Sequence, residues 1–418
     1  MQLKVLGAAR EVGRSAFLIK GNGTNVLLDH GVLMQRETGF PVHIQANEVD
    51  AILLSHAHLD HSGATPMFYL KNGPKLYATG LTIELSQLLI EDLLRISGFY
   101  LPFEYAELNE MIRKTVKTTP KKKEKIGSFE VEFVDAGHIP GSSSIILEDG
   151  TKRILYTGDL NAENTQLLSG ANYDLGELDL VISESTYATA DHESRTQVES
   201  DFVSFAKEIV EQNGTLFVPA FSVGRAQEIA CVLNAANFPY PVAMDGMALK
   251  TNEILSRYPE YLRDAVEFRR AIDHVEVIRN WNQRRKIVNI PGVIISPAGM
   301  LVGGTATYYN QAVSQKTKNA ISIVAYQVAG TPGRTLLEKG ITMIKGKPRK
   351  VKAQVRRFDF SSHSGKFDLL TMMKKIKGSP KVIMIHGEEK SCLTFADDIH
   401  ENLGFETFAP TSGETYDF

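Results

Sequence analysis

Apolar residues along the first 190 positions recur in short runs of strand length, and each run closes on glycine, aspartate, histidine or another turn former. Runs of this kind, rich in β-branched residues, are typical of β-strands. Residues 81–97 differ, because their apolar positions follow the spacing of an amphipathic helix. This part is therefore predicted to form packed sheets with helices outside. The predicted strands lie in LKVLG, SAFLIK, NVLLDHG, AILLSHAH, KLYAT, FEVEFVDAGH, SSIILE, RILYTGD and LVISEST.

The pattern changes from about Ser194, where a long helical stretch is followed by apolar strands that alternate with glycine-bearing turns and helices. This alternation predicts parallel βα units, whose functional groups collect at the carboxyl ends of the strands. After about Arg357 we expect two more βα units. In the first, a run to Phe360 precedes a helix over GKFDLLTMMKKI, and in the second, KVIMIHG precedes a helix through Leu403.

Composition limits the class of protein. With 418 residues, 43% hydrophobic and 23% charged, the chain is long enough for two to three globular domains and unlike disordered, collagen-like or membrane-spanning chains. The net charge of -3 does not indicate a nucleic-acid partner. Basic residues are nevertheless concentrated at 340–357, at 113–125 and at 279–286 around the single Trp281. One such run is more often a solvated face than a binding surface.

Two cysteines, Cys231 and Cys392, are too few for a disulfide framework, which fits a reducing compartment. The opening segment mixes charged with apolar residues, and no run of about 18 apolar residues occurs. We therefore expect a cytoplasmic protein with no membrane partner.

Three of the 11 histidines stand in the string HAHLDH at 56–61, directly after an apolar run. Imidazole and carboxylate ligands suit zinc and related metals, whereas magnesium and calcium prefer oxygen. His138, Asp159 and His386 also follow apolar runs and adjoin glycine. Taken alone, His138 could be a turn histidine, Asp159 a turn or helix-capping aspartate, and His386 a buried histidine with its hydrogen bonds satisfied. Their recurrence at strand ends favours a metal site.

The ordered set continues with Glu184 in SESTYA, His363 in SSHSG and His386 in IHGEE, and it is accompanied by GAAREVGRS, FSVGRAQE, ISPAGM and YQVAGTPGR. Together these motifs resemble the β-CASP branch of the metallo-β-lactamase superfamily over essentially the whole chain. They are most similar to archaeal-type cleavage and polyadenylation specificity factor ribonucleases that lack KH domains. The resemblance implies an α/β protein, in which an αββα metallo-β-lactamase sandwich (1–190 and 358–418) is interrupted by a Rossmann-like β-CASP domain (191–357).

The resemblance also implies roles for individual residues. Asp29 would support the metal loop from behind the ligands, and Glu184 would orient His363, the general acid. Asp60 would be a catalytic residue together with Glu184 and His363, and it would also be a metal ligand. The implied ligands are His56, His58 and His138 for one zinc, Asp60, His61 and His386 for the other, and Asp159 bridging both. Gly365 departs from relatives that carry Asp there, and Ala16 from some that carry Cys.

The implied activity is zinc-dependent hydrolysis of phosphodiester bonds in single-stranded RNA, in RNA 3′-end processing or turnover. A hydroxide bridging two Zn²⁺ per chain would attack and leave a 5′-phosphate and a 3′-hydroxyl. The sequence leaves open an additional 5′→3′ exonuclease action, Mn²⁺ in place of zinc, and a homodimer. RNA phosphate or sugar contacts are expected from glycine turns and neighbouring hydroxyls, at Ser222, Arg225, Ser296, Ser361, Ser362 and Ser364.

Three alternatives compete with a ribonuclease. A DNA-processing nuclease shares the same core and is the hardest to separate. Hydrolysis of a small ester, thioester or lactam is disfavoured, because it needs neither a domain-sized insertion nor basic runs. A non-catalytic RNA-binding scaffold is disfavoured, because every implied ligand is present together with Glu184 and His363.

Overall fold

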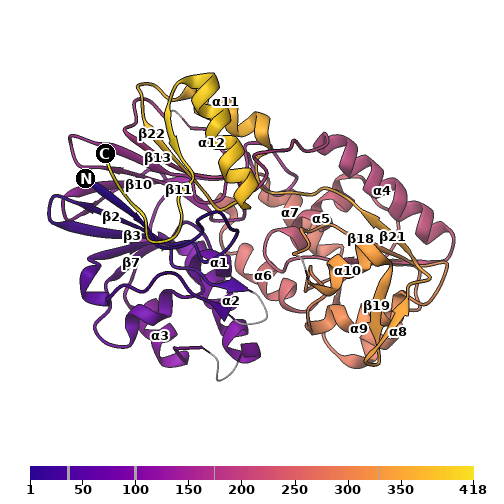
Figure 1. The fold of residues 1–418 in the computed structure, drawn as a ribbon. Helices are drawn as coiled ribbons and strands as arrows, with labels where there is room; N and C mark the ends of the chain where they lie inside the picture. The colour runs from indigo at the N-terminus through magenta and orange to yellow at the C-terminus, as the bar shows by residue number, and fades with distance from the viewer. Residues whose placement is uncertain (35–37, 98–100, 174, 329) are drawn as a thin grey trace. The chain divides into compact units, whose positions relative to one another are not determined.

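The computed structural model describes residues 1–34, 38–97, 101–173, 175–328 and 330–418 (Figure 1). The chain divides into two compact units. The first unit comprises Met1–Glu163, Gly170–Asp191 and Ser362–Phe418, and the second comprises Asn164–Ser169 and His192–Ser361. No helix among the described residues is both long and apolar enough to cross a membrane.

The first unit contains two seven-stranded sheets, and every strand predicted from the apolar runs is present in them. One sheet has the order β24-β1-β2-β3-β6-β7-β8, and the other has the order β23-β22-β13-β12-β11-β10-β9. The strands of the first sheet are β1 Gln2–Val5, β2 Phe17–Gly21, β3 Thr24–Leu28, β6 Ala51–Leu53, β7 Lys75–Thr79, β8 Thr115–Thr118 and β24 Thr415–Asp417. Those of the second are β9 Lys123–Ile126, β10 Phe129–Asp135, β11 Ser143–Glu148, β12 Arg153–Tyr156, β13 Leu180–Glu184, β22 Lys381–Ile385 and β23 Glu406–Phe408.

Three buried clusters give this unit its layers. Residues such as Leu28 and Phe133 lie in one cluster drawn from both sheets. The outer face of the first sheet packs against helices α2 (Gly80–Ser97) and α3 (Tyr105–Arg113), and that of the second sheet against α11 (Lys366–Lys375) and α12 (Glu389–Leu403). Helices therefore cover both outer faces of a two-sheet sandwich. The predicted αββα sandwich is confirmed.

The second unit is built on a six-stranded sheet of order β16-β15-β17-β14-β18-β21, in which every neighbouring pair is parallel. This is the predicted Rossmann-like arrangement. The strands are β14 Thr215–Pro219, β15 Val242–Asp245, β16 Glu276–Ile278, β17 Gly292–Ser296, β18 Ala320–Ile323 and β21 Gln354–Arg357. The helices are α4 Arg195–Glu211, α5 Arg225–Ala235, α6 Met247–Leu255, α7 Ala265–Asp273, α8 Trp281–Ile287, α9 Gly304–Val313 and α10 Pro332–Lys339.

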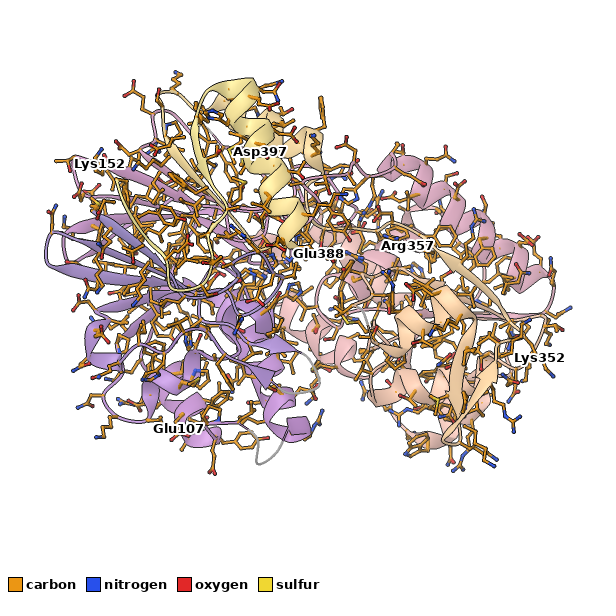
Figure 2. The ribbon with its side chains drawn as sticks, in the orientation of Figure 1. Glu107, Lys152, Lys352, Arg357, Glu388 and Asp397 are labelled. Atoms are coloured by element: carbon orange, nitrogen blue, oxygen red, sulfur yellow. The ribbon has the colours of Figure 1, made fainter. Side chains whose placement is uncertain are left out.

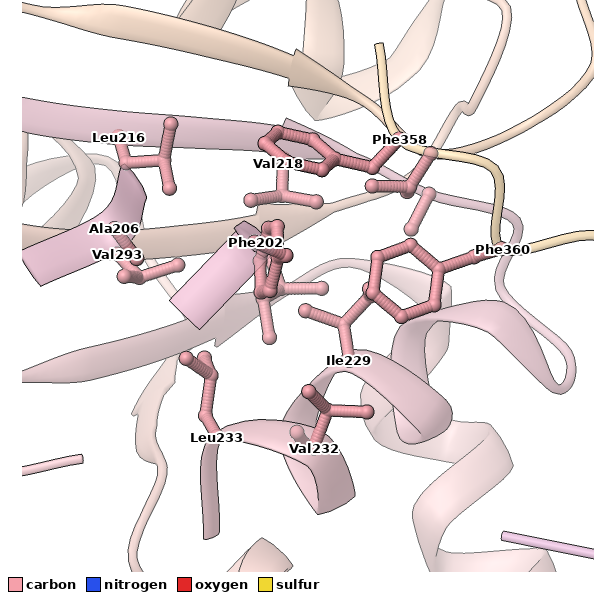
Figure 3. Close-up of a cluster of buried hydrophobic side chains, with 14 of the residues drawn as sticks. Phe202, Ala206, Leu216, Val218, Ile229, Val232, Leu233, Val293, Phe358 and Phe360 are labelled. Atoms are coloured by element: carbon pink, nitrogen blue, oxygen red, sulfur yellow. The ribbon is translucent and has the colours of Figure 1, made fainter. Parts of the chain in front are cut away.

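The predicted end of the strand before α11 is wrong. The run predicted to reach Phe360 ends as a strand at Arg357, and this strand joins the sheet of the second unit by pairing with β18. Phe358 and Phe360 are buried, with ring centroids each 5.4 Å from that of Phe202 (Figure 3). Their apolar character therefore reflects core packing and not a continued strand.

A short segment at 164–169, inside the predicted first domain, groups with the second unit. The buried carboxylate of Glu228 explains this, because it accepts the backbone N–H groups of Gln166 at 3.1 Å and Leu167 at 2.8 Å. The guanidinium of Arg195 neutralises the same carboxylate at 2.8 Å. A buried ion pair of this kind cannot be read from local sequence.

Candidate metal centre

Strand ends of the first unit deliver all the candidate ligands. The HAHLDH string follows β6 and runs into the one-turn helix α1 (Leu59–Ser62). His138 follows β10, Asp159 follows β12 and His386 follows β22, so the two sheets contribute from the same ends of their strands. His386 takes a left-handed backbone conformation, with φ of 51°, directly where its strand ends.

Asp159 is buried at the centre of the cluster, and its two carboxylate oxygens face different histidines. The Oδ2 atom lies 3.5 Å from Nε2 of His56 and 3.6 Å from Nε2 of His138. The Oδ1 atom lies 3.3 Å from Nε2 of His61 and 3.2 Å from Nδ1 of His386. One carboxylate thus stands between two sets of nitrogen donors.

Within each set, nitrogen and oxygen atoms converge on one another. Nδ1 of His58 lies 3.1 Å from Nε2 of His138, and Nε2 of His386 lies 3.3 Å from both Nε2 of His61 and Oδ2 of Asp60. Among the described residues, no hydrogen-bond partner meets the buried Nε2 atom of His56. Groups that could hold a metal ion therefore form on both sides of Asp159: His56, His58, His138 and Asp159 on one side, and His61, Asp159 and His386 on the other.

Burial sets the protonation of one group of imidazoles. Removal from water lowers the pKa of His58 to about 4, and it lowers the pKa of His56 and of His138 well below the usual value, with help from neighbouring imidazoles. His61 differs: burial alone would lower its pKa, but the carboxylates of Asp159 and Asp29 outweigh burial and raise it. Neutral imidazole is the form that binds a metal.

Asp29, at the end of β3, is fully buried behind His61. Its Oδ2 atom accepts hydrogen bonds from Nδ1 of His61 at 2.8 Å, the Ser55 hydroxyl at 2.6 Å and the Tyr156 hydroxyl at 2.6 Å. Its Oδ1 atom accepts the backbone N–H of Ser55 at 2.7 Å. Because Nδ1 of His61 is held this way, its Nε2 atom points toward Asp159 and His386.

Replacing Asp29 by Asn is expected to weaken metal binding about 10- to 100-fold, as is typical when the partner of a ligating histidine is lost. An amide has one accepting oxygen for four donors and no charge to fix the tautomer of His61. Competition with a chromophoric chelator measures the affinity. Asp50→Asn is a matched control, since its carboxylate accepts an N–H at the surface, from Asn25 at 2.7 Å. Equal affinities for the two variants would contradict the prediction.

Glu184 and His363 form a pair beside the cluster. Glu184 is buried at the end of β13, and its two carboxylate oxygens lie 3.1 and 3.0 Å from Nδ1 of His363. The Oε1 atom also accepts the N–H of Leu160 at 2.7 Å. Burial acts to lower the pKa of His363, but Glu184 outweighs it and raises the pKa to about 9. The His363 ring centroid lies 4.5 Å from that of His138.

Comparison with known proteins assigns the family. The model of the metallo-beta-lactamase superfamily matches residues 9–200, that of the Beta-Casp domain matches 226–336, and that of the RMMBL region, a Zn-dependent metallo-hydrolase RNA specificity domain, matches 348–410. RNase aCSPSF2 of Saccharolobus solfataricus is 37% identical over 99% of this chain and 84% of its own length. The chain belongs to the β-CASP branch of the metallo-β-lactamase superfamily.

Other members of this β-CASP branch match at similar identity. The Probable RNase MJ4 of Methanocaldococcus jannaschii is 35% identical over 99% of both chains, and its Transcription termination factor FttA is 34% identical over 98% of this chain and 70% of its own length. A crystal structure of a protein of unknown function from Enterococcus faecalis V583 superposes with a TM-score of 0.64 at 17% identity over 99% of both chains, which supports the fold alone.

Gly365, one of the two departures predicted from the sequence, is the N-cap residue directly before α11. A Cβ atom there would lie 3.1 Å from Oδ1 of Asp191, and that same oxygen accepts the backbone N–H of Phe367 at 2.7 Å. Asp191 therefore supplies a carboxylate at the start of α11 in this chain. Ala16, the other departure, belongs to a buried apolar cluster.

The structure brings the ligand candidates together, whereas the residues expected to contact RNA are divided between the two units. The hydroxyl of Ser296 is buried against that of Thr305 at 2.7 Å, and the hydroxyl of Ser364 accepts the N–H of Ala162 at 3.0 Å. Both hydroxyls therefore have a partner within the protein, and a contact of Ser296 or Ser364 with RNA stays a prediction. Ser222, Arg225 and Ser361 lie in the second unit, and Ser362 lies in the first.

Several polar groups around the metal-ligand cluster were not predicted from the sequence. Tyr156 and Ser55 share the carboxylate of Asp29, and the hydroxyl of Thr186 lies 3.2 Å from Nδ1 of His386. The carbonyl oxygen of Ser362 lies 2.7 Å from Nδ1 of His138. Tyr156, which follows the buried Ile154 and Leu155 in β12, was a signal in the sequence, since a buried hydroxyl needs a partner.

Proposed function

We propose that this chain is a zinc-dependent ribonuclease that hydrolyses phosphodiester bonds of single-stranded RNA. The observation that carries the proposal is the position of Asp159 between two sets of donors, with the His363 imidazole beside one of them. The names of the RNase relatives support an RNA substrate, and the intact donor set counts against a silent scaffold. A role in RNA 3′-end processing or turnover is part of the proposal.

The proposed ligands are those implied by the sequence: His56, His58 and His138 for one ion, Asp60, His61 and His386 for the other, and Asp159 between them. When bound, two zinc ions would supply Lewis acidity and an activated water. His363 would donate a proton to the departing 3′-oxygen through Nε2, because Nδ1 is held by Glu184. Glu184 keeps the imidazole oriented and stabilises its protonated form.

The decisive experiment incubates the purified chain with matched single-stranded RNA and DNA, with and without a chelator. The proposal expects cleavage of RNA that stops with chelator and returns with zinc, and fragments that carry a 5′-phosphate and a 3′-hydroxyl. A 2′,3′-cyclic phosphate would sink the mechanism, since it means that the ribose hydroxyl attacked. Equal or faster cleavage of DNA would favour the DNA-processing alternative. Light scattering on the same sample tests whether the chain forms a homodimer, which the sequence leaves open.

The basic run at 340–357 forms an exposed β-hairpin, β19 (Ile341–Ile344) with β20 (Lys347–Lys350), followed by strand β21. Lys345 and Gly346 turn the hairpin, with φ of 48° and 74°, the two positive values that a tight two-residue turn requires. Lys352, just before β21, and Arg357, its last residue, are labelled in Figure 2. The exposed cations of the basic run at 340–357 are Lys345, Lys347, Arg349, Lys350, Lys352, Arg356 and Arg357.

Replacing Lys347, Arg349 and Lys350 together by Gln is expected to reduce the salt dependence of RNA binding. Three lost phosphate contacts would lower the slope of log affinity against log salt by about 2 for a single strand. Fluorescence anisotropy over a salt series measures it. Gln at Lys374, Lys375 and Lys377, near the end of α11, is a matched control. The same slope in both triple variants would exclude the hairpin from the RNA path.

A further inference from the structure

Trp281, the single tryptophan of the chain, lies in the second unit, just beyond the carboxyl end of a parallel strand. Trp281 opens α8, which follows β16 after two residues. Because β14 to β18 are parallel, the residues that follow each of them lie at the same end of the sheet, the carboxyl end of its strands. In open α/β sheets, ligands bind beyond the carboxyl ends of the strands. Trp281 is 54% exposed there.

A charged residue fixes one side of the indole. The guanidinium carbon of Arg284 lies 4.9 Å from the Trp281 ring centroid. Arg284 donates from Nε at 2.6 Å and Nη2 at 2.9 Å to the two carboxylate oxygens of the buried Asp245. Asp245 also accepts the Tyr309 hydroxyl at 2.7 Å. The guanidinium is therefore held in one place, and a fixed cation favours one position of the ring above it.

The backbone and a second ring restrict Trp281 further. Asn280 caps α8, accepting the N–H of Gln283 at 3.0 Å, while Gln283 accepts the N–H of Asn280 in return. The ring of Tyr308 meets the indole at an interplanar angle of 88°, with centroids 5.3 Å apart. An exposed aromatic that is already ordered loses little conformational freedom when it binds a ligand.

The surrounding charge indicates what that ligand is. Arg279 precedes Trp281 in the sequence, and Arg285 and Lys286 follow it in α8; all three are exposed, and in the described part of the chain no ion pair neutralises them. A lone exposed apolar side chain needs no explanation. An ordered indole that packs on a guanidinium and lies in a segment rich in exposed cations fits single-stranded nucleic acid, whose bases stack on aromatic rings and whose phosphates bind cations.

We propose that Trp281, backed by Arg284, stacks a nucleobase of single-stranded RNA, while Arg279, Arg285 and Lys286 contact the flanking phosphates. The inference rests on the proposed function and adds to it a base contact in the second unit. Stacking is tolerant of sequence because every base has a π-face. The contact therefore selects unpaired strands and not particular bases.

The lone tryptophan allows a direct test. The full-length His363→Ala chain is titrated with a fluorescently labelled single-stranded RNA under conditions where no cleavage occurs. Anisotropy of the label reports binding, and tryptophan emission reports Trp281 alone. We expect quenching that follows the anisotropy curve. Trp281→Ala should weaken binding about ten-fold, the equivalent of one stacked base, and Trp281→Phe should restore most of it. Tyr105→Ala, at a 51% exposed aromatic on α3, should change nothing.

The outcomes separate the inference from the function. Saturated binding with unchanged tryptophan emission, or unchanged affinity in Trp281→Ala, would overturn the stacking contact and leave the ribonuclease proposal standing. A change in self-association of Trp281→Ala without a change in RNA affinity would assign this face to a second copy of the chain, and would also overturn it. No RNA binding by any variant would refute the proposed function, and the contact with it.

Discussion

Replacing His363 by Ala is expected to lower the turnover of single-stranded RNA about 10²- to 10⁴-fold, the range for loss of a general acid. The reason lies in its partner. Both oxygens of the buried Glu184 are within 3.1 Å of Nδ1 of His363, and one of them also accepts the N–H of Leu160. Glu184 is therefore committed to orienting the imidazole. The expected loss corresponds to about 3–5 kcal/mol of transition-state stabilisation.

Metal content decides between two roles for His363. Asp159, Glu184 and His363 also lie close enough together to hold an ion, so His363 could in principle be a ligand. If His363 is a general acid, the His363→Ala variant should keep the metal content of the unaltered chain. Elemental analysis after gel filtration measures this content. Loss of one ion together with activity would show that His363 is a ligand, and our assignment would be wrong.

Two further variants sharpen this test. Glu184→Gln should lower turnover in the same direction, because an amide can accept a hydrogen bond from Nδ1 but cannot stabilise the protonated ring. His400→Ala is the control, since the exposed His400 lies near the end of α12 and donates from Nδ1 to the carbonyl oxygen of Phe405 at 2.9 Å. A similar loss of turnover in His400→Ala would point to general damage by removal of histidine.

Local patterns predicted packed sheets with helices outside and located the strand ends that carry the candidate ligands, whereas the αββα order was implied by the family resemblance. Each apolar run that became a strand is bounded by turn formers, and the ligand candidates adjoin those turns, as His138 does after Gly137 and Asp159 after Gly158. A strand in a buried sheet delivers the next residue to the sheet edge whatever lies elsewhere. For this reason a one-dimensional pattern located a three-dimensional cluster.

Pairings between distant segments could not be predicted in this way. The hydrogen bond from Tyr156 to Asp29 joins residues 127 positions apart, and Arg284 reaches Asp245 across 39 positions. Phe360 was misplaced for a related reason. An apolar residue after a strand can continue the strand or enter a core, and the partner that decides, Phe202, lies in another helix. Such choices depend on packing, which periodicity does not contain.

Asp159 is the residue whose loss should have the widest effect, because among the described residues it is the carboxylate that faces both sets of donors. Its Oδ2 atom lies close to His56 and His138, and its Oδ1 atom lies close to His61 and His386. Replacing Asp159 by Asn removes the negative charge that offsets two cations and leaves one accepting oxygen. We therefore expect both ions to bind more weakly and RNA cleavage to fall to the level of the chelated enzyme.

The stoichiometry of metal binding tests whether Asp159 is shared. His56→Ala and His386→Ala each disturb one set, so each should retain about half the metal of the unaltered chain, whereas Asp159→Asn should retain less than either. Asp179→Asn is the control, because that carboxylate accepts the N–H of Arg153 at 2.9 Å and pairs with Lys152, labelled in Figure 2, at 2.9 Å, outside the cluster. If Asp159→Asn kept one ion at full affinity, the carboxylate would belong to a single set of ligands, and the site would have to be described as two independent ones.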